Sequence, residues 1–266
     1  MNEPAIGPVD RGCPHFSMVG GLRTHARLYG KSHTQTLVIL PGMGCASWMY
    51  YRLAQVLSRR SRVYAYDPPG HGRSRGRLSF PTSTAELTDH LALWLQVNRL
   101  GGAALLGHSL GGEVMLDLAV RYPSLAGPLI ACSPTGIPTN PRIRLQIGRL
   151  LRDMPGERSA FLLPATAAYL RAGPLRFYQL ARDIKGRDSR PLAAHLSVPL
   201  LLISGTADPV VAPWPLARLA ATLPGVRSVT LTGAPHALTD AVPLEVAQQT
   251  WMLLDSLATS TTLLGH

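Results

Sequence analysis

The sequence has little cysteine, little negative charge and no long apolar run, and each shortage excludes a class of protein. Its three cysteines, Cys13, Cys45 and Cys132, are scattered among 266 residues without a C-x-x-C pair. This spacing suggests neither a zinc site nor a disulfide framework. No stretch approaches the roughly 18 apolar residues of a membrane span. No repeat of about 20 to 50 residues indicates a solenoid or propeller.

The first 12 residues also lack the apolar stretch of a signal peptide, since they carry Glu3 and two prolines. We therefore expect a cytoplasmic protein with no membrane span. Hydrophobic residues make up 46% of the chain and charged residues 15%. This composition excludes a disordered chain and is sufficient for a sizeable core.

The charge balance is strongly basic, with 26 Lys and Arg against 15 Asp and Glu and a net charge of +11. Such a balance indicates nucleic acid, an anionic membrane surface, or an acidic substrate or partner. Only Lys31 and Lys185 are lysines, and this preference for Arg is equally consistent with codon bias.

Short apolar runs alternate with amphipathic segments along most of the chain. The runs cover residues 36–40, 62–66, 103–106, 128–132, 198–203 and 226–231. Near-continuous runs of this length are typical of strands buried on both faces of a parallel sheet. The helical segments include one that begins with a capping box of Ser83 and Glu86, and three others at 112–122, 214–223 and 244–257. Residues 16–30 predict a leading antiparallel hairpin that turns at Gly20-Gly21.

The alternation stops between residues 135 and 193, where no strand pattern occurs. Three helices are predicted there, at 142–154, 159–172 and 174–184, separated by Pro-Gly and Gly-Pro pairs. We expect an α/β fold, a mostly parallel doubly wound sheet with a helical cap inserted between two strands. The core comprises residues 1–134 and 194–266, and the cap comprises residues 135–193.

The strongest chemical signal is Gly107-His108-Ser109-Leu110-Gly111, which directly follows a predicted strand and directly precedes a predicted helix. This is the setting of a nucleophile elbow, in which a sharp turn exposes the serine. The turn requires Gly107 and Gly111 because a Cβ at either position would clash with the neighbouring strand or helix. Ser109 is therefore the candidate nucleophile.

A serine nucleophile needs a base, usually a histidine that a carboxylate orients. His236 and Asp208 each follow a predicted strand, and such loops gather at the edge where Ser109 lies. The chain order Ser, Asp, His is that of the hydrolases with this elbow. Asp240 is a weaker candidate for the acid because it lies only four residues after His236. The oxyanion donors are predicted to be the backbone N–H groups of Leu110 and Met43, with the Met43 side chain lining the acyl pocket.

These motifs together resemble the α/β-hydrolase superfamily, in particular its compact serine hydrolases with a helical cap. The resemblance covers about residues 16–258 and rests on PGMG at 41–44, DPPGHGRS at 67–74, GHSLGG at 107–112, GTADPVV at 205–211 and GAPH at 233–236. It implies Ser109 as nucleophile, Asp208 as acid and His236 as base, and structural roles for His71 and His108. Many relatives have His-Gly where this chain has Pro41-Gly42. A serine nucleophile argues against haloalkane dehalogenase or epoxide hydrolase chemistry.

We predict a serine hydrolase that cleaves a carboxylic ester or thioester through an acyl-enzyme and needs no cofactor or metal. Three alternatives stay open: hydrolysis of a C–C bond in a diketone-type substrate, perhydrolase activity of the haloperoxidase kind, and a hydrolase-fold ligand-binding protein with slow turnover.

The predicted cap carries +7 of the net charge, from ten Arg and Lys185 against four acidic residues. Because a cap in this fold covers the active-site edge, this charge favours an anionic acyl substrate or an acidic carrier protein. A merely solvated helical face explains the same charge, with Arg142, Arg149 and Arg152 lying over apolar neighbours. Nucleic acid is not expected, because no basic stripe interleaved with aromatic residues occurs.

Overall fold

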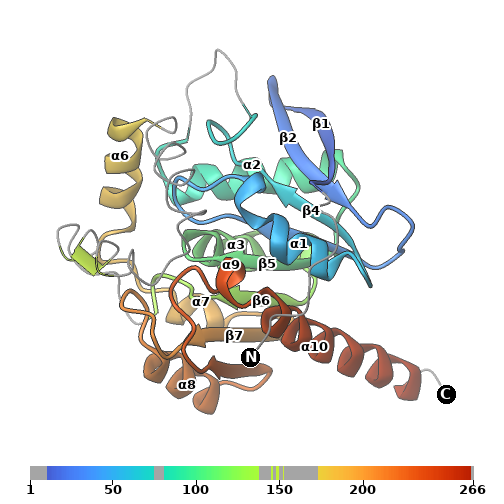
Figure 1. Cartoon of the computed structure of the whole chain (residues 1–266), viewed down its shortest axis with the longest axis vertical. Helices are drawn as coiled ribbons and strands as arrows, with labels where there is room; N and C mark the ends of the chain where they lie inside the picture. Colours follow the sequence, from blue (N-terminus) through green and yellow to red (C-terminus); the bar gives the residue numbers. More distant parts are fainter. Residues whose placement is uncertain are drawn as a thin grey trace.

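The computed structural model describes residues 11–74, 81–137, 145, 148–149, 152 and 173–264. Eight strands form one sheet in the order β1-β2-β4-β3-β5-β6-β7-β8 (Figure 1). The strands are β1 (Cys13–Val19), β2 (Leu22–Tyr29), β3 (Thr36–Leu40), β4 (Arg62–Tyr66), β5 (Ala104–His108), β6 (Leu129–Cys132), β7 (Leu200–Gly205) and β8 (Val226–Leu231). The β1–β2 and β2–β4 pairs are antiparallel, and the other pairs are parallel. The predicted mostly parallel sheet and the leading hairpin are thus confirmed.

Helices pack on both faces of this sheet (Figure 1). The α-helices are α1 (Tyr51–Leu57), α2 (Thr84–Val97), α3 (Leu110–Arg121), α6 (Pro174–Ile184), α7 (Arg190–Ala194), α8 (Pro213–Thr222), α9 (Leu238–Ala241) and α10 (Pro243–Leu264), and the 3-10 helices are η1 (Ser47–Tyr50) and η2 (Pro123–Leu125). Successive strand residues point to opposite faces. Val38 therefore belongs to the buried cluster that includes residues of α2, α3 and α8, whereas Leu37 and Ile39 belong to the one that includes residues of α1, α9 and α10.

Two elements differ in detail from the sequence prediction. Helix α3 begins at Leu110 rather than residue 112, and Gly111 and Gly112 are both helical. The sequence pattern placed the start too late because glycine contributes nothing to an apolar pattern. Strand β8 is one of the two edge strands, and its residues are half-buried or exposed rather than buried on both faces.

The capping box at α2 has a modified form. The Ser83 side chain accepts the Glu86 N–H as predicted, but the Glu86 carboxylate accepts the N–H of Thr82. A further cap comes from a distant helix, since Asp183 of α6 accepts both the N–H and the hydroxyl of Thr84 at 2.8 and 2.9 Å. The start of α2 is thus tied to α6.

Part of the predicted cap is described. The helix at 174–184 is α6 and has the predicted bounds, whereas most of the helix predicted at 142–154 and all of the one at 159–172 lie outside the described residues. The division into core and cap therefore stays a prediction. The described part contacts the sheet domain at α2 and α3, because Asp183 bonds to Thr84 and Arg187 lies 3.8 Å from Glu113.

None of the described helices is both long and apolar enough to cross a membrane.

Candidate active site

Ser109 lies on a strained turn between β5 and α3. Its φ of 52° is in the left-handed region, which non-glycine residues rarely adopt. A Cβ at Gly107 would lie 2.5 Å from the Gly111 carbonyl oxygen, and a Cβ at Gly111 would collide with the Leu40 carbonyl oxygen. The tight packing of strand against helix thus explains both glycines, as the sequence predicted.

The three residues predicted as a triad are brought together at the carboxyl edge of the sheet. His236 Nε2 lies 3.2 Å from Ser109 Oγ, and His236 Nδ1 lies 3.0 Å from Asp208 Oδ2. Because a carboxylate only accepts hydrogen bonds, we assign the hydrogen to Nδ1, which leaves Nε2 to accept the serine hydroxyl. Asp208 and His236 are both buried, with relative exposures of 7% and 6%. This hydrogen-bonded chain can move a proton from the serine to the imidazole.

Several groups keep Asp208 ionised. Burial alone raises the pKa of this carboxyl, but the charge and hydrogen bond of His236 and the N–H of Val211 outweigh it and lower the pKa below its ordinary value. The Ser133 hydroxyl acts in the same direction from outside standard hydrogen-bond geometry. The backbone N–H groups of Val210 and Val211 donate to Oδ1 at 2.7 and 2.9 Å. Asp208 therefore has one oxygen fixed by its own loop and the other free to hold His236.

The other carboxylate in the histidine loop has a different position. The ring Nδ1 of His236 is bonded to Asp208, so Asp240 does not take that position. Its carbonyl oxygen instead accepts the buried guanidinium of Arg52 at 2.6 Å. This arrangement agrees with the preference for Asp208.

The predicted oxyanion donors flank the serine. Gly42, next to Met43, lies so close to the elbow that a Cβ there would be 3.2 Å from Ser109 Cβ. Leu110 is the first residue of α3. In the described part of the chain, the backbone hydrogen bonds outside helices and strands use neither the Met43 nor the Leu110 N–H. Neither group therefore has a backbone acceptor among the described residues.

A small apolar cavity of about 20 Å³ lies beside these donors. Its walls include Met43, Leu110 and Val114, and the role of the Met43 side chain in an acyl pocket stays a prediction. His71 also borders the cavity, and its Nδ1 lies 3.1 Å from the Pro69 carbonyl oxygen.

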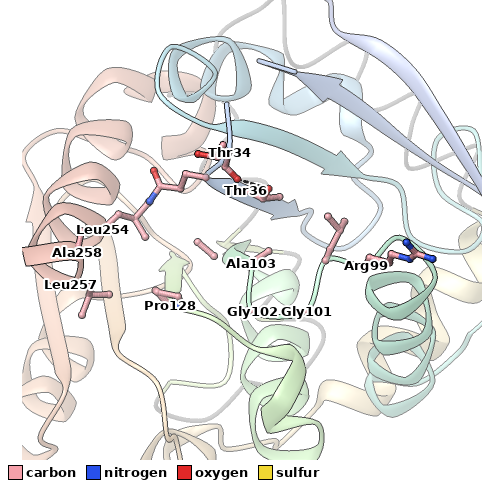
Figure 2. Close-up of a pocket in the computed structure, with 13 residues that line it drawn as sticks. Thr34, Thr36, Arg99, Gly101, Gly102, Ala103, Pro128, Leu254, Leu257 and Ala258 are labelled. Carbon is pink, nitrogen blue, oxygen red and sulfur yellow. Dashed lines mark hydrogen bonds between the residues drawn. The ribbon is translucent and has the colours of Figure 1, made fainter. Parts of the chain in front are cut away.

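A larger hollow, of about 470 Å³, lies at the opposite edge of the sheet. Thr36, Ala103 and Pro128, near the starts of β3, β5 and β6, and Leu254 of α10 line it (Figure 2). Arg99 is its single titratable lining residue. Its lining therefore includes no His, Cys, Asp or Glu side chain.

Sequence reasoning gave no role to Tyr50, whose buried hydroxyl lies within 2.9 Å of His108 Nδ1. No local pattern singles out this tyrosine, because its partners are distant in sequence. His108, predicted to be structural, is buried and points to Tyr50 and to the backbone of His236.

Within the described ranges, no group of three or more His, Cys, Asp or Glu side chains is arranged to hold a metal ion.

Comparison with known protein families agrees with the fold and with the geometry of the site. The family model described as "Alpha/beta hydrolase family" matches residues 37–249. The chain belongs to the alpha/beta hydrolase family. It is 26% identical over 235 residues to the proposed carbamate hydrolase RutD of Yersinia enterocolitica, an alignment that covers 77% of this chain and 81% of that protein.

Solved structures of other alpha/beta hydrolases share the fold. The enol-lactonase of Burkholderia xenovorans superimposes with a TM-score of 0.77 at 22% identity, covering 91% of this chain and all of that chain. The meta-cleavage product hydrolase of Pseudomonas fluorescens superimposes with a TM-score of 0.78 at 18% identity, covering 91% of this chain and 98% of that chain. At these identities the likeness concerns the fold alone.

Proposed function

We propose that this alpha/beta hydrolase cleaves a carboxylic ester or thioester through an acyl-enzyme on Ser109. The observation that carries the proposal is the continuous hydrogen-bonded chain from Ser109 through His236 to an ionised Asp208. A serine hydroxyl is a weak nucleophile until such a base removes its proton.

In the first half-reaction, Ser109 Oγ bonds to the acyl carbon while its proton moves to His236 Nε2. The N–H groups of Met43 and Leu110 stabilise the oxyanion. The bond to the alcohol or thiol then breaks, and the leaving group takes the proton from His236. In the second half-reaction, water attacks the acyl carbon, His236 accepts the water proton and returns it to Ser109 Oγ, and the carboxylic acid leaves. Asp208 holds the tautomer of His236 and stabilises its charged form throughout.

A carbamate is the second candidate substrate class, and the likeness to the proposed carbamate hydrolase of Yersinia supports it. The same residues would serve, because a carbamate also presents a carbonyl carbon to the nucleophile and a leaving group to the acid.

We further propose that the enzyme prefers an anionic substrate. The negative charge would belong to a small acyl substrate or to an acidic carrier protein that presents the acyl group. Two exposed basic residues, Arg182 in the last turn of α6 and Lys185 directly after it, make no ion pair with any described residue and support this preference. Arg149 lies near the acid loop, since its guanidinium is 3.3 Å from the Val210 carbonyl oxygen.

The test combines labelling and turnover. A fluorophosphonate probe should label the wild-type protein at Ser109 and leave Ser109→Ala unlabelled, with unchanged thermal unfolding. p-Nitrophenyl esters of increasing acyl length, acyl thioesters and aryl carbamates should then be compared by kcat/KM. Absence of labelling in the folded wild-type protein would contradict the proposal, and a marked preference for carbamates would favour the second class.

A further inference from the structure

Two buried polar side chains beside the triad have no part in the proposed reaction steps. Tyr50 ends η1 and His108 ends β5, with relative exposures of 3% and 5%. Gly42 N–H donates to Tyr50 Oη at 2.9 Å, Tyr50 Oη lies 2.9 Å from His108 Nδ1, and His108 Nε2 lies 3.0 Å from the His236 carbonyl oxygen. These three hydrogen bonds connect the loop after β3 to the loop after β8.

The chemistry of the partners assigns each proton in this chain. Burial, reinforced by the nearby His236, lowers the pKa of His108 to about 3, so its ring is neutral and has one N–H. The His236 carbonyl only accepts, so that hydrogen is on Nε2. Nδ1 is then an acceptor for the Tyr50 hydroxyl, and the Tyr50 oxygen accepts the Gly42 N–H. With these assignments, each of the three hydrogen bonds has one donor and one acceptor, and no two donors face each other.

The chain ends at the two groups whose placement matters most to acyl transfer. At one end it holds Gly42, the residue before the proposed donor Met43. At the other end it holds the backbone of His236, and the His108 and His236 rings also pack with centroids 5.2 Å apart. Ser109 follows His108 directly, so the nucleophile lies between the two ends.

We infer that Tyr50 and His108 form a hydrogen-bonded strut that holds the oxyanion loop and the His236 loop at a fixed separation across Ser109. Both are positioning residues, and this role rests on the proposed acyl-transfer function. A displacement of about 1 Å at a reacting group can cost about a hundredfold in rate, whereas substrate binding depends less on it. The strut should therefore affect kcat more than KM.

Three substitutions cut the strut at different links. Tyr50→Phe removes the acceptor of Gly42 N–H and the donor to His108. His108→Asn places an amide oxygen near the Nδ1 position and loses the bond to His236. His108→Gln places an amide N–H near the Nε2 position and loses the bond from Tyr50. His90→Asn is the matched control, because His90 belongs to a separate chain that runs from Tyr66 to Thr24.

Kinetics on the best acyl substrate give the first readout. Tyr50→Phe and His108→Asn should each lower kcat by roughly 10- to 100-fold with KM within about threefold, and His90→Asn should leave both unchanged. The double variant Tyr50→Phe/His108→Asn should lose little more than the worse single variant, because both changes interrupt one strut. Unchanged kcat in the folded single variants, or fully additive losses, would overturn the inference.

Hydrogen exchange gives a second readout that needs no activity. His108→Asn should speed amide exchange in residues 41–45, although the Tyr50–Gly42 bond remains possible, and Tyr50→Phe should speed exchange in residues 233–238. If each substitution affects only its own side, the strut does not exist even in an active enzyme. If the cross-loop effects appear but the wild-type protein neither reacts with fluorophosphonate nor cleaves acyl substrates, the strut stands and the proposed function fails.

Discussion

The position and the reactivity of Ser109 Oγ depend on two things, the local backbone turn and a side chain that is distant in the sequence. The left-handed φ of 52° at this residue is set by the turn between β5 and α3. Its hydroxyl partner, His236, is 127 residues away in sequence. The two glycines explain how the turn is possible, and only the fold explains why a base is opposite it.

Asp208 is expected to be the acid of the triad, and Asp240 provides a matched control. Asp208→Asn should lower kcat by roughly 10⁴-fold, because the amide cannot enforce the His236 tautomer. Asp240→Asn should keep activity within about threefold, since Asp208 already holds the ring Nδ1 of His236. Steady-state kinetics on folded variants would decide, and loss of activity in Asp240→Asn alone would contradict the assignment.

His108 should make the protein less stable in acid. Its pKa is about 3 in the folded state and about 6.5 when unfolded, so between these values the unfolded chain binds a proton that the folded chain does not. The free energy of unfolding should therefore fall as pH drops from about 6.5, by up to about 1.4 kcal/mol per pH unit. Denaturant unfolding between about pH 5 and 7 should show a shallower slope in His108→Gln.

The same experiment has an internal control. His90 has its pKa lowered to about 4, also by burial, so its contribution remains in His108→Gln. An identical pH slope in wild type and His108→Gln would show that His108 is not held neutral in the folded protein.

At the scale of elements, the contact between α6 and α2 is a cap supplied by tertiary structure. Asp183→Ala should cost about 1–2 kcal/mol of unfolding free energy, because the Thr84 N–H and hydroxyl lose their acceptor. Asp183→Asn keeps an acceptor oxygen and should cost less. Hydrogen exchange should show faster opening of α6 and of the first turn of α2 in Asp183→Ala.

Equal stability of Asp183→Ala and wild type would show that the Ser83 cap is sufficient for α2. Ser83→Ala is the local comparison, expected to cost about 1 kcal/mol. The sequence pattern predicted the Ser83 cap but not the Asp183 cap, because residue 183 is 99 positions from its partner.

At the scale of the whole molecule, part of the basic charge behind the net charge of +11 is engaged in ion pairs. Arg187 and Arg190 pair with Asp183 and Asp188, so these two charges support structure. Arg182 and Lys185 are exposed, and the proposed anionic preference gives them the steering role.

If the charge steers substrates, kcat/KM for an anionic ester should fall several-fold between roughly 20 and 300 mM salt, while a neutral ester of the same length should be unaffected. Arg182→Glu/Lys185→Glu should lower kcat/KM for the anionic ester at low salt. Arg59→Glu/Arg227→Glu makes the same charge change on exposed residues of the sheet domain and serves as control. If the two double variants lower kcat/KM for the anionic ester equally, local steering by Arg182 and Lys185 is contradicted. The net charge of the protein would then explain the effect.

The sequence by itself determined the strands, most helices and the order of the candidate residues. Buried parallel strands must be apolar over their whole length, and the elbow needs glycine at two fixed positions, so both leave a local record. Strand ends in a parallel sheet share one edge, which is why Asp208 and His236 were identified from their place after strands.

Only the tertiary structure decided which groups meet across that edge. The bond from His108 to the His236 backbone joins residues 128 positions apart, and Tyr50 is 58 positions from His108. Hydrogen bonds of this kind depend on the relative placement of loops to within a few tenths of an ångström. No residue pattern records such a distance, because many sequences place the same residue types in loops that never meet.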